Sequence, residues 1–383
     1  MRVKDVVILR NEKTTDTSRR YIGLENITSW DAQFVETTSE TEGTNNIFYP
    51  NDILFGKLRP YLAKGYIPQY EGICSTEFFV MSCKRGVLPH YLLYVFLSHA
   101  IIDYVKNQVA GVKMPRTNWN EFGNIKIVLP SLPDQQKIVS YLDEKTFAID
   151  TKVELLEKKK DAYTRLKKAV INRAVTRGLD EHVKLKDSGV EWIGMIPEHW
   201  EVKRLKDVVT MRNEKTVDVS MPYIAMENIV SWNANYVETI VETEGINNIF
   251  KSGDILFGKL RPYLAKGYIP SYDGICSTEF FVLKPNRMVS NRFLLYYILS
   301  KKVIDFIKNK VAGVKMPRTN WNEFGSLPAN MPPYIEQQAI SAYLDAQCAK
   351  IDAALANIDK QIDALKRLKR SLINEVITGQ RTV

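Results

Sequence analysis

The sequence repeats itself at a fixed offset. The sixteen residues ILFGKLRPYLAKGYIP stand at 53–68 and again, letter for letter, at 255–270, so the two copies are 202 positions apart. The same offset, without a gap, relates GICSTEFFV at 72–80 and 274–282, and VAGVKMPRTNWNEFG at 109–123 and 311–325. Solenoid repeats recur every ~20–50 residues, which is far shorter. The repeat therefore indicates the duplication of a whole domain, and this chain must build one fold twice.

Each repeat begins with a part that mixes strands and helices. DILFG (52–56), EFFVMS (77–82) and IKIVL (125–129) are short apolar runs between turn residues, and they predict strands. The run at 91–108, repeated at 293–309, predicts a buried helix. The fold class expected for this part is therefore α+β.

Each repeat ends in a long helix with the spacing of a coiled coil. In the second copy, apolar residues step by 4, 3, 4 and 3 positions at Ile351, Leu355, Ile358, Ile362 and Leu365. The first copy keeps this seam at Ile149, Val153 and Leu156, loses it at Lys160, and resumes it at Tyr163, Leu166 and Val170. A helix of this kind spans roughly 65 Å, more than one globular domain needs.

The two long helices are expected to pair with each other. A pseudo-two-fold axis would make them antiparallel, with one globular domain at each end of the rod. The expected segments are domain 1 at 1–132, helix 1 at 133–178, a linker at 179–203, domain 2 at 204–333 and helix 2 at 334–380.

Charge favours a polyanionic partner. The chain has 53 Lys and Arg against 44 Asp and Glu, a net charge of +9, which suits nucleic acid. Residues 151–177 alone hold nine basic and three acidic residues, consistent either with a solvated helix face or with a surface for DNA or an acidic protein. There is no long apolar run, no leader pattern and no CxxC pair among the four cysteines, so a cytoplasmic protein without a membrane partner is expected.

Two repeated loops supply the candidate DNA-binding residues. In the first loop, basic groups surround a tyrosine after a strand, a pattern suited to phosphates or base edges. The second loop carries Lys, Arg and Asn, the residue types that bond guanine, adenine and phosphate. The candidates are Lys57, Arg59, Tyr61, Lys64, Lys113, Arg116 and Asn118, with their copies Lys259, Arg261, Tyr263, Lys266, Lys315, Arg318 and Asn320. The alternative is a solvated loop whose Tyr61 side chain belongs to the core, and RNEKT (10–14) is a third candidate.

No catalytic pattern accompanies these loops. The sequence has no phosphate-binding glycine loop, no HExxH and no GxSxG. NMPPY (330–334) approaches the motif with which amino-methyltransferases hold adenine, but Met331 stands where that motif needs Asn or Asp. A proline stop before the long helix is the simpler interpretation. No metal site, catalytic residue or cofactor of the chain's own is expected.

These features together resemble a known family. Two α+β domains alternate with two long helices, each of which starts at LPDQQ or PPYIEQQ, and SGVEWIGMIPEHWEVKRLKDV (188–208) leads into the second domain. The chain resembles the specificity (S) subunit of type I restriction–modification systems over nearly its whole length. The resemblance implies that each α+β domain is a target recognition domain for one half of a split DNA site. It also implies that the helices set the spacing and dock two methyltransferase (M) subunits that use S-adenosylmethionine, and that restriction (R) subunits join where DNA is cut.

The chain departs from the family pattern in two ways. Arg2 already aligns with Arg204, so no counterpart of the segment 188–203 precedes the first domain in this sequence. Family members usually have two dissimilar recognition domains, whereas these two are nearly the same. Two like domains related by a two-fold axis should read two like half-sites, so we expect a palindromic split site.

Two other functions stay open at this point. A coiled-coil adaptor would use its globular ends to bind proteins rather than DNA. A nuclease could use the residue types of DEK (143–145), although the second copy has DAQ (345–347) at the same positions.

Overall fold

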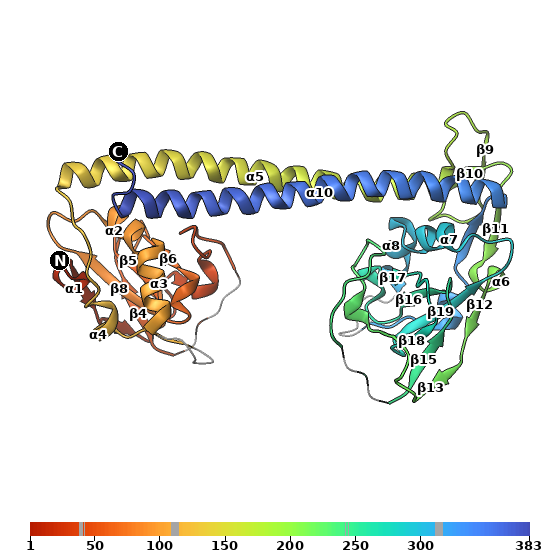
Figure 1. The fold of residues 1–383 in the computed structure, drawn as a ribbon, viewed down its shortest axis with the longest axis horizontal. Coiled ribbons are helices and arrows are strands. Elements are labelled where there is room, and N and C mark those ends of the chain that lie inside the picture. The colour runs from red at the N-terminus through yellow and green to blue at the C-terminus, as the bar shows by residue number, and fades with distance from the viewer. Residues whose placement is uncertain (38–40, 42, 109–114, 242, 244, 311–316) are drawn as a thin grey trace. The chain divides into compact units, whose positions relative to one another are not determined.

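The computed structural model describes residues 1–37, 41, 43–108, 115–241, 243, 245–310 and 317–383 (Figure 1). The chain divides into two compact units. Unit 1 comprises Met1–Lys158 with Ile358–Val383, and unit 2 comprises Lys159–Asn357. Each unit therefore contains one α+β domain together with a segment of each long helix.

The α+β domain of unit 1 holds two four-stranded sheets. One sheet has the order β1-β8-β5-β6 and is antiparallel, and the other has the order β2-β4-β7-β3, in which β3 and β7 are parallel. The strands are β1 (Val7–Arg10), β2 (Lys13–Thr14), β3 (Tyr21–Ile22), β4 (Asn45–Phe48), β5 (Ile53–Gly56), β6 (Gly65–Tyr66), β7 (Gly72–Cys74) and β8 (Phe78–Cys83).

The first sheet is buried on both faces, which explains its uninterrupted apolar runs. Along β5, Ile53 and Phe55 join the core beneath the helices, whereas Leu54 joins the core between the sheets. Along β8, Phe79 and Phe78 divide in the same way. The strands predicted from DILFG and EFFVMS are thus confirmed as β5 and β8.

Short helices cover the outer face of the first sheet. They are α1 (Val3–Val6), α2 (Pro89–Phe96), α3 (His99–Gln108) and α4 (Trp119–Phe122), with the 3₁₀ turn η2 (Pro60–Leu62), whereas Leu24 of the 3₁₀ turn η1 (Leu24–Asn26) packs against the core between the sheets. The single helix predicted at 91–108 is wrong, because the chain breaks between α2 and α3. The buried Ser98 lies at the break, and its hydroxyl donates to the carbonyl of Val95 at 2.6 Å. A side chain that bonds the backbone in this way competes with helix continuation.

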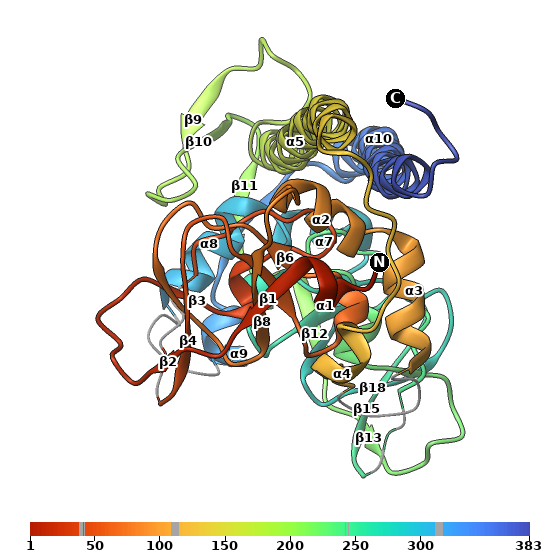
Figure 2. The ribbon, with the colours of Figure 1, turned by 90° about the vertical axis from the view of Figure 1, so that its left-hand side faces the viewer.

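In unit 1 the start of α5 (Leu132–Arg177) packs against the end of α10 (Tyr334–Ile377). Leu142 of α5 forms a cluster with Leu372, Ile373 and Val376 of α10, and Tyr94 of α2 packs against it. The two helical segments run in opposite directions beside the domain (Figures 1 and 2). The predicted antiparallel pairing is therefore confirmed within this unit.

Unit 2 repeats the same domain. Its sheets have the orders β12-β19-β16-β17 and β13-β15-β18-β14. The strands are β12 (Val209–Arg212), β13 (Lys215–Thr216), β14 (Tyr223–Ile224), β15 (Asn247–Phe250), β16 (Ile255–Gly258), β17 (Gly267–Tyr268), β18 (Gly274–Cys276) and β19 (Phe280–Pro285). The helices are α6 (Leu205–Val208), α7 (Asn291–Ile298), α8 (Lys301–Lys310) and α9 (Trp321–Phe324), with η3 (Met226–Asn228) and η4 (Pro262–Leu264).

Unit 2 also holds the segment that precedes its domain. This segment forms a small hairpin from β9 (Leu185–Asp187) and β10 (Met195–Pro197), and then β11 (Glu201–Arg204), which pairs antiparallel with β20 (Pro328–Met331). The strand predicted at IKIVL in the first repeat is wrong. There the structure has an isolated bridge between Arg2 and Lys126, and the Ile127 N–H donates to the Met1 carbonyl at 2.9 Å, without a strand at 125–129.

The end of α5 packs against the start of α10 in unit 2. Ile171, Ala174 and Val175 share a core with Ile340 and Leu344. The coiled-coil seam departs from the prediction at one turn, since Leu166 is 48% exposed and the neighbouring Lys167 is buried instead. Among the described residues, no helix has the length and apolar character needed to cross a membrane.

Candidate nucleic-acid interface

The two candidate loops of each domain form one surface. Leu58 and Arg116 make an antiparallel bridge, in which the Arg59 N–H donates to the Pro115 carbonyl at 2.8 Å and the Thr117 N–H donates to the Lys57 carbonyl at 3.0 Å. The second domain repeats this bridge at Leu260 and Arg318. Segments that are more than fifty positions apart in sequence are therefore adjacent in space.

The first loop has an unusual backbone. Arg59 and Ala63 flank η2 and both have left-handed φ values, 48° and 49°. Left-handed conformations are uncommon for residues with a side chain, and they persist where surrounding contacts fix them. Here the Arg59 N–H is held by Pro115, and Pro60 and Ala63 are buried. The buried residues fix the loop, and the Arg59 side chain is exposed.

Three of the candidates in each domain are exposed. They are Arg59, Arg116 and Asn118 in unit 1, and Arg261, Arg318 and Asn320 in unit 2. Each Asn also caps a short helix, because its side-chain oxygen accepts the backbone N–H three residues later at 3.0 Å. Each helix start is therefore fixed next to the bridge, which places the arginine and the asparagine on one rigid turn.

The other candidates of the first loop have partners within the domain. The Lys57 amine donates to the Thr76 carbonyl at 2.7 Å and lies over the Phe79 ring, and burial lowers the pKa of Lys57. The Lys64 amine donates to the Leu24 carbonyl at 2.7 Å. Tyr61 is half-buried and packs against the core. The loop in unit 2 repeats this arrangement: Lys259 lies over Phe281 with a pKa lowered by burial, Lys266 donates to Met226, and Tyr263 is half-buried.

This surface also contains an acidic residue that the sequence analysis did not identify as a candidate. Glu77 pairs with Arg116 at 2.8 Å, and Glu279 pairs with Arg318 at 2.9 Å. Both glutamates lie in the repeated block GICSTEFFV, so their presence in both copies was the available signal. A carboxylate beside an arginine orients its guanidinium, and a phosphate or a base edge can compete for the same hydrogen bonds.

The remaining candidates fall elsewhere. Lys113 and Lys315 lie outside the described residues. In RNEKT, Arg10 pairs with the buried Asp52 at 2.8 Å, which gives this arginine a structural contact inside the domain. In DEK, Asp143 accepts a hydrogen bond from the Tyr94 hydroxyl at 2.7 Å, and Lys145 pairs with Glu144.

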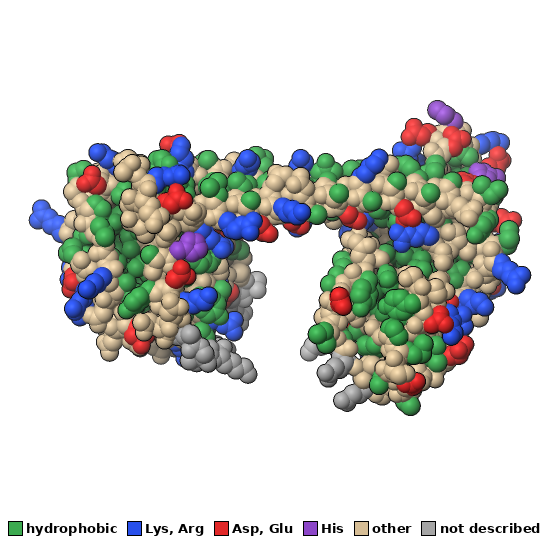
Figure 3. All heavy atoms as spheres, in the orientation of Figure 1, with side chains coloured by type: hydrophobic (Ala, Val, Ile, Leu, Met, Phe, Trp, Pro, Cys, Tyr) green, Lys and Arg blue, Asp and Glu red, His purple; other side chains and the backbone are tan. Residues whose placement is uncertain are grey.

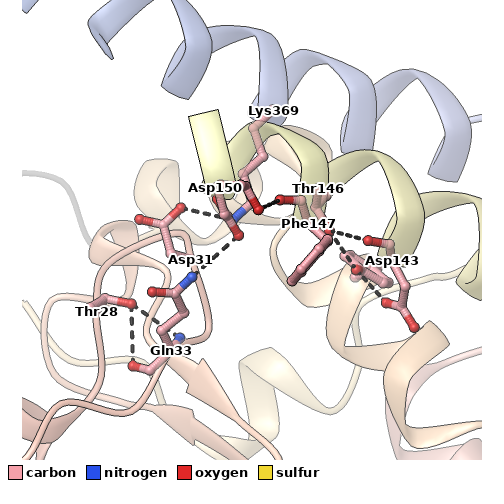
Figure 4. Close-up of polar contacts among 10 residues, drawn as sticks. Thr28, Asp31, Gln33, Asp143, Thr146, Phe147, Asp150 and Lys369 are labelled. Atoms are coloured by element: carbon pink, nitrogen blue, oxygen red, sulfur yellow. Dashed lines mark hydrogen bonds and ion pairs between the residues drawn. The ribbon is translucent and has the colours of Figure 1, made fainter. Parts of the chain in front are cut away.

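A lysine junction fixes the domain of unit 1 to its two helical segments (Figure 4). The amine of Lys369 on α10 contacts both carboxylate oxygens of Asp150 on α5, at 2.7 and 2.8 Å, and Asp31 of the domain at 3.2 Å. Gln33 adds a hydrogen bond to Asp150 at 3.3 Å. Arg370 lies over the Trp30 ring at 4.8 Å from its centroid. One turn of α10 thus holds α5 and the domain loop together.

Unit 2 contains the equivalent lysine junction with the helices exchanged. Here Lys167 on α5 pairs with Asp352 on α10 at 2.7 Å and also donates to the side-chain oxygen of Asn233. Lys168 lies over the Trp232 ring at 3.9 Å. The domain therefore has the same support in both units, with Asp31 replaced by Asn233.

The basic character of 151–177 is partly neutralised by such contacts. Lys167 is buried in its junction, Lys158 pairs with Glu154, and Arg173 pairs with Glu181. Acidic and basic side chains both appear along the helices in the face shown in Figure 3. The helices are therefore mixed in charge rather than uniformly cationic.

Comparisons with known proteins agree on one family. The model of the type I restriction modification DNA specificity domain matches residues 1–162 and 197–364. The EcoDI specificity subunit of a type I restriction enzyme from Escherichia coli is 23% identical over 295 residues, which are 71% of this chain and 66% of that protein. The MjaVIII specificity subunit from Methanocaldococcus jannaschii is 24% identical over 331 residues, 81% of this chain and 74% of that protein.

A solved structure supports the fold. One solved chain superposes on this one with a TM-score of 0.72. It comes from a structure of the type I R-M system that concerns complex assembly and conformational transition. It is 18% identical, and the superposition covers 98% of this chain and 96% of that one. At this identity the likeness concerns the fold.

Proposed function

Because the chain belongs to the family of type I restriction modification DNA specificity domains, we propose that it is the non-catalytic recognition subunit of such a system. Each α+β domain reads one half of a split DNA site. The observation that carries this proposal is the bridged surface of Arg59, Arg116 and Asn118, which occurs identically in both domains.

The chemistry of this surface suits DNA. Arginine can bond two acceptors on guanine or a phosphate, and asparagine can bond adenine. The fixed backbone of the loop limits the conformations of these side chains, which reduces the entropy lost on binding. The half-buried Lys57 and Lys64 reinforce the loop from within and add positive charge near the phosphates.

The proposed site is a palindrome interrupted by an unspecified spacer. The two loops are identical in both domains from 53 to 68 and from 115 to 123, so both domains present the same donors and acceptors. The two domains should then prefer the same bases, each on its own half-site.

The proposed partners are double-stranded DNA, two M subunits, and R subunits in systems that cleave. S-adenosylmethionine would bind to the M subunits, which would methylate adenine, and this chain would need no cofactor. The complex would act in the cytoplasm, without a membrane partner.

Co-expression with the neighbouring methyltransferase gene tests the proposal, followed by single-molecule sequencing for N6-methyladenine. A split palindromic motif is expected, and it should vanish when the methyltransferase is expressed alone. Two unrelated half-sites would refute the palindrome but not the recognition function. Absence of any methylation, together with absence of a complex on a sizing column, would refute both.

A coiled-coil adaptor is the alternative, and apolar side chains on the helices favour it, since Phe147 and Ile335 are strongly exposed. The dependence of DNA affinity on salt concentration distinguishes the two functions. Phosphate contacts make DNA affinity fall steeply as salt increases, whereas an adaptor should show no such DNA binding.

A further inference from the structure

A third segment of the domain, the turn at 75–77 between β7 and β8, is tied to the first candidate loop. The Glu77 N–H donates to the Ser75 hydroxyl oxygen at 3.2 Å, and the Glu77 carbonyl accepts the backbone N–H of Lys57 at 2.7 Å. The Lys57 amine donates to the carbonyl of Thr76 at 2.7 Å. The backbone of Glu77 is therefore fixed to the first loop on both sides of its side chain.

The glutamate side chain extends from this turn to the second candidate loop. Glu77 Oε1 lies 2.8 Å from Arg116 Nη2, and in unit 2 Glu279 Oε1 lies 2.9 Å from Arg318 Nη2. In both units the glutamate side chain is 26% exposed and the arginine side chain is 61% exposed. The carboxylate is thus the anchored member of each pair, and the guanidinium is the accessible one.

The pair leaves most of the guanidinium available to a ligand. An arginine side chain carries several N–H donors, and the bond to the glutamate uses only those on Nη2. Within the described part of the chain, Arg116 and Arg318 each bond one side chain, that of the glutamate. Guanine presents two acceptors, O6 and N7, that one arginine can bond together. An arginine oriented by the glutamate can therefore still bond a guanine edge.

A phosphate interacts with this pair differently from a base. An arginine that turns toward a phosphate leaves its glutamate unpaired beside the negative charge of the DNA backbone, and like charges in contact repel each other. A neutral guanine edge causes no such repulsion, because the arginine keeps its glutamate while it bonds the base. Phosphate contacts carry no sequence information directly. A glutamate at this place therefore opposes the contacts that all DNA sequences offer.

We propose that Glu77 and Glu279 are positioning residues that determine the specificity of DNA recognition. Each glutamate holds its arginine in the orientation that bonds a guanine of the half-site, and each opposes the pairing of that arginine with phosphates of non-specific DNA. The inference rests on the proposed function, since it takes double-stranded DNA as the ligand. It assigns the discrimination between DNA sequences partly to an acidic residue within a basic surface.

The test is the double variant E77Q/E279Q in the complete methyltransferase complex, because glutamine keeps the shape of glutamate without its charge. The affinity is measured at several salt concentrations for a duplex with the methylated motif and for a duplex without it. Affinity for the second duplex should rise by up to about fivefold per domain, the range of an exposed ion pair. The slope of log affinity against log salt should steepen by about 0.9 for each arginine that gains a phosphate. Affinity for the first duplex should not rise, so the ratio of the two affinities should fall.

Two controls separate the arginine contact from a general effect of charge. E181Q removes the same charge from a pair outside the candidate loops, since Glu181 pairs with the exposed Arg173 at 2.6 Å. It should leave the salt slope and the affinity ratio unchanged. In the R116A/R318A background, E77Q/E279Q should no longer steepen the salt slope, because the arginines that would reach the phosphates are absent.

Three results would overturn the inference. Equal weakening on both duplexes with an unchanged salt slope would mean that the glutamates only stabilise the fold of the loops. Weakening on the duplex with the motif alone, again with an unchanged slope, would mean that the glutamates themselves bond a base. A preference for the motif that E77Q/E279Q keeps in full would refute the positioning role and leave the proposed function intact. A wild-type complex that binds both duplexes equally would instead refute the proposed function, and this inference with it.

Discussion

Lys369 in unit 1 and Lys167 in unit 2 occupy the same position in the repeat, but their surroundings differ at one residue. Lys369 contacts the carboxylates of Asp150 and Asp31, whereas Lys167 contacts the carboxylate of Asp352 and the amide oxygen of Asn233. The pair between the two helices is the same in both units. The domain loop contributes a carboxylate in unit 1 and an amide oxygen in unit 2. The two copies therefore share the pair between the helices and differ in how the domain loop contacts the lysine.

The difference changes the local charge balance. Each lysine side chain is nearly buried, 6% exposed in unit 1 and 11% in unit 2. The cation faces two carboxylates in unit 1 and one in unit 2. Removing the lysine should therefore leave more uncompensated negative charge in unit 1.

The largest expected effect comes from replacing these lysines by methionine. K369M leaves Asp31 and Asp150 close together without a cation, which should cost about 3 kcal/mol of local stability. K167M leaves only Asp352 unpaired and should cost about 2 kcal/mol. Hydrogen exchange at residues 28–33 and 230–235 measures each junction separately, because a chain of two units need not unfold in one step.

The matched control is K266M, which removes the lysine that bonds the carbonyl of Met226 inside the domain of unit 2. It should not change exchange at residues 28–33. Equal losses in K369M and K167M would mean that Asp31 contributes nothing to the junction in unit 1.

The next prediction concerns the regions in which the two units agree. R59A and R261A should each weaken DNA binding by about 1–3 kcal/mol, because arginine contacts to bases have this magnitude. The two losses should be equal on a palindromic site, since the loops are identical. Titration of the complete methyltransferase complex with a DNA duplex, at one fixed salt concentration, measures both.

R381A is the control for the loss of a positive charge away from the loops, since Arg381 pairs with Glu375 at the end of the chain. Unequal losses for R59A and R261A would contradict equal half-sites. No loss in either variant would remove Arg59 and Arg261 from the interface.

Much of the fold follows from the sequence because its signals are local or are doubled by the repeat. The short apolar runs of β5 and β8, bounded by turn residues, and the heptads of the long helices predict these elements directly. The break at Ser98 was missed because Ser is only a weak helix breaker, and its effect depends on a bond to Val95. At IKIVL only a short pairing with residues 1–3 forms, and local sequence does not show how far such a pairing extends.

The sequence predicted which residue types form the candidate DNA-binding surface, but not which contacts their side chains make. The repeated blocks identified the exposed Arg59, Arg116 and Asn118 as candidates. They could not show that Lys57 and Lys64 bond carbonyls inside the domain, because those carbonyls are distant in sequence. The lysine junctions escaped detection for the same reason, since Lys369 and Asp150 are 219 positions apart.

The two lysine junctions can be interconverted by exchanging the one residue at which they differ. D31N gives unit 1 the composition of unit 2 and should cost about 1 kcal/mol, the difference expected between a charge-assisted and a neutral hydrogen bond. N233D should stabilise unit 2 by a similar or smaller amount, because a second carboxylate then faces Lys167. Hydrogen exchange at residues 28–33 and 230–235 measures both effects.

A double-mutant cycle isolates the interaction. Once Lys369 has been replaced by methionine, D31N should no longer destabilise unit 1, and it should relieve repulsion with Asp150 instead. An unchanged effect of D31N in the K369M background would show that Asp31 acts through contacts other than the lysine.

The smallest expected effect lies one residue farther along each helix. Arg370 lies over Trp30 in unit 1, and Lys168 lies over Trp232 in unit 2. Exposed cation–π contacts contribute about 0.5–1 kcal/mol, so R370K and K168R should change local exchange by less than that, in opposite directions. Arginine also stacks its planar group on the ring, which an ammonium cannot do, so the arginine form should be the more stable in both units. W30L and W232L set the upper limit of the measurement, because they remove the ring from under either cation. If R370K and W30L change local hydrogen exchange by the same amount, the contribution of Arg370 depends on the guanidinium plane rather than on the charge. In that case the two units differ in the kind of contact as well as in its strength.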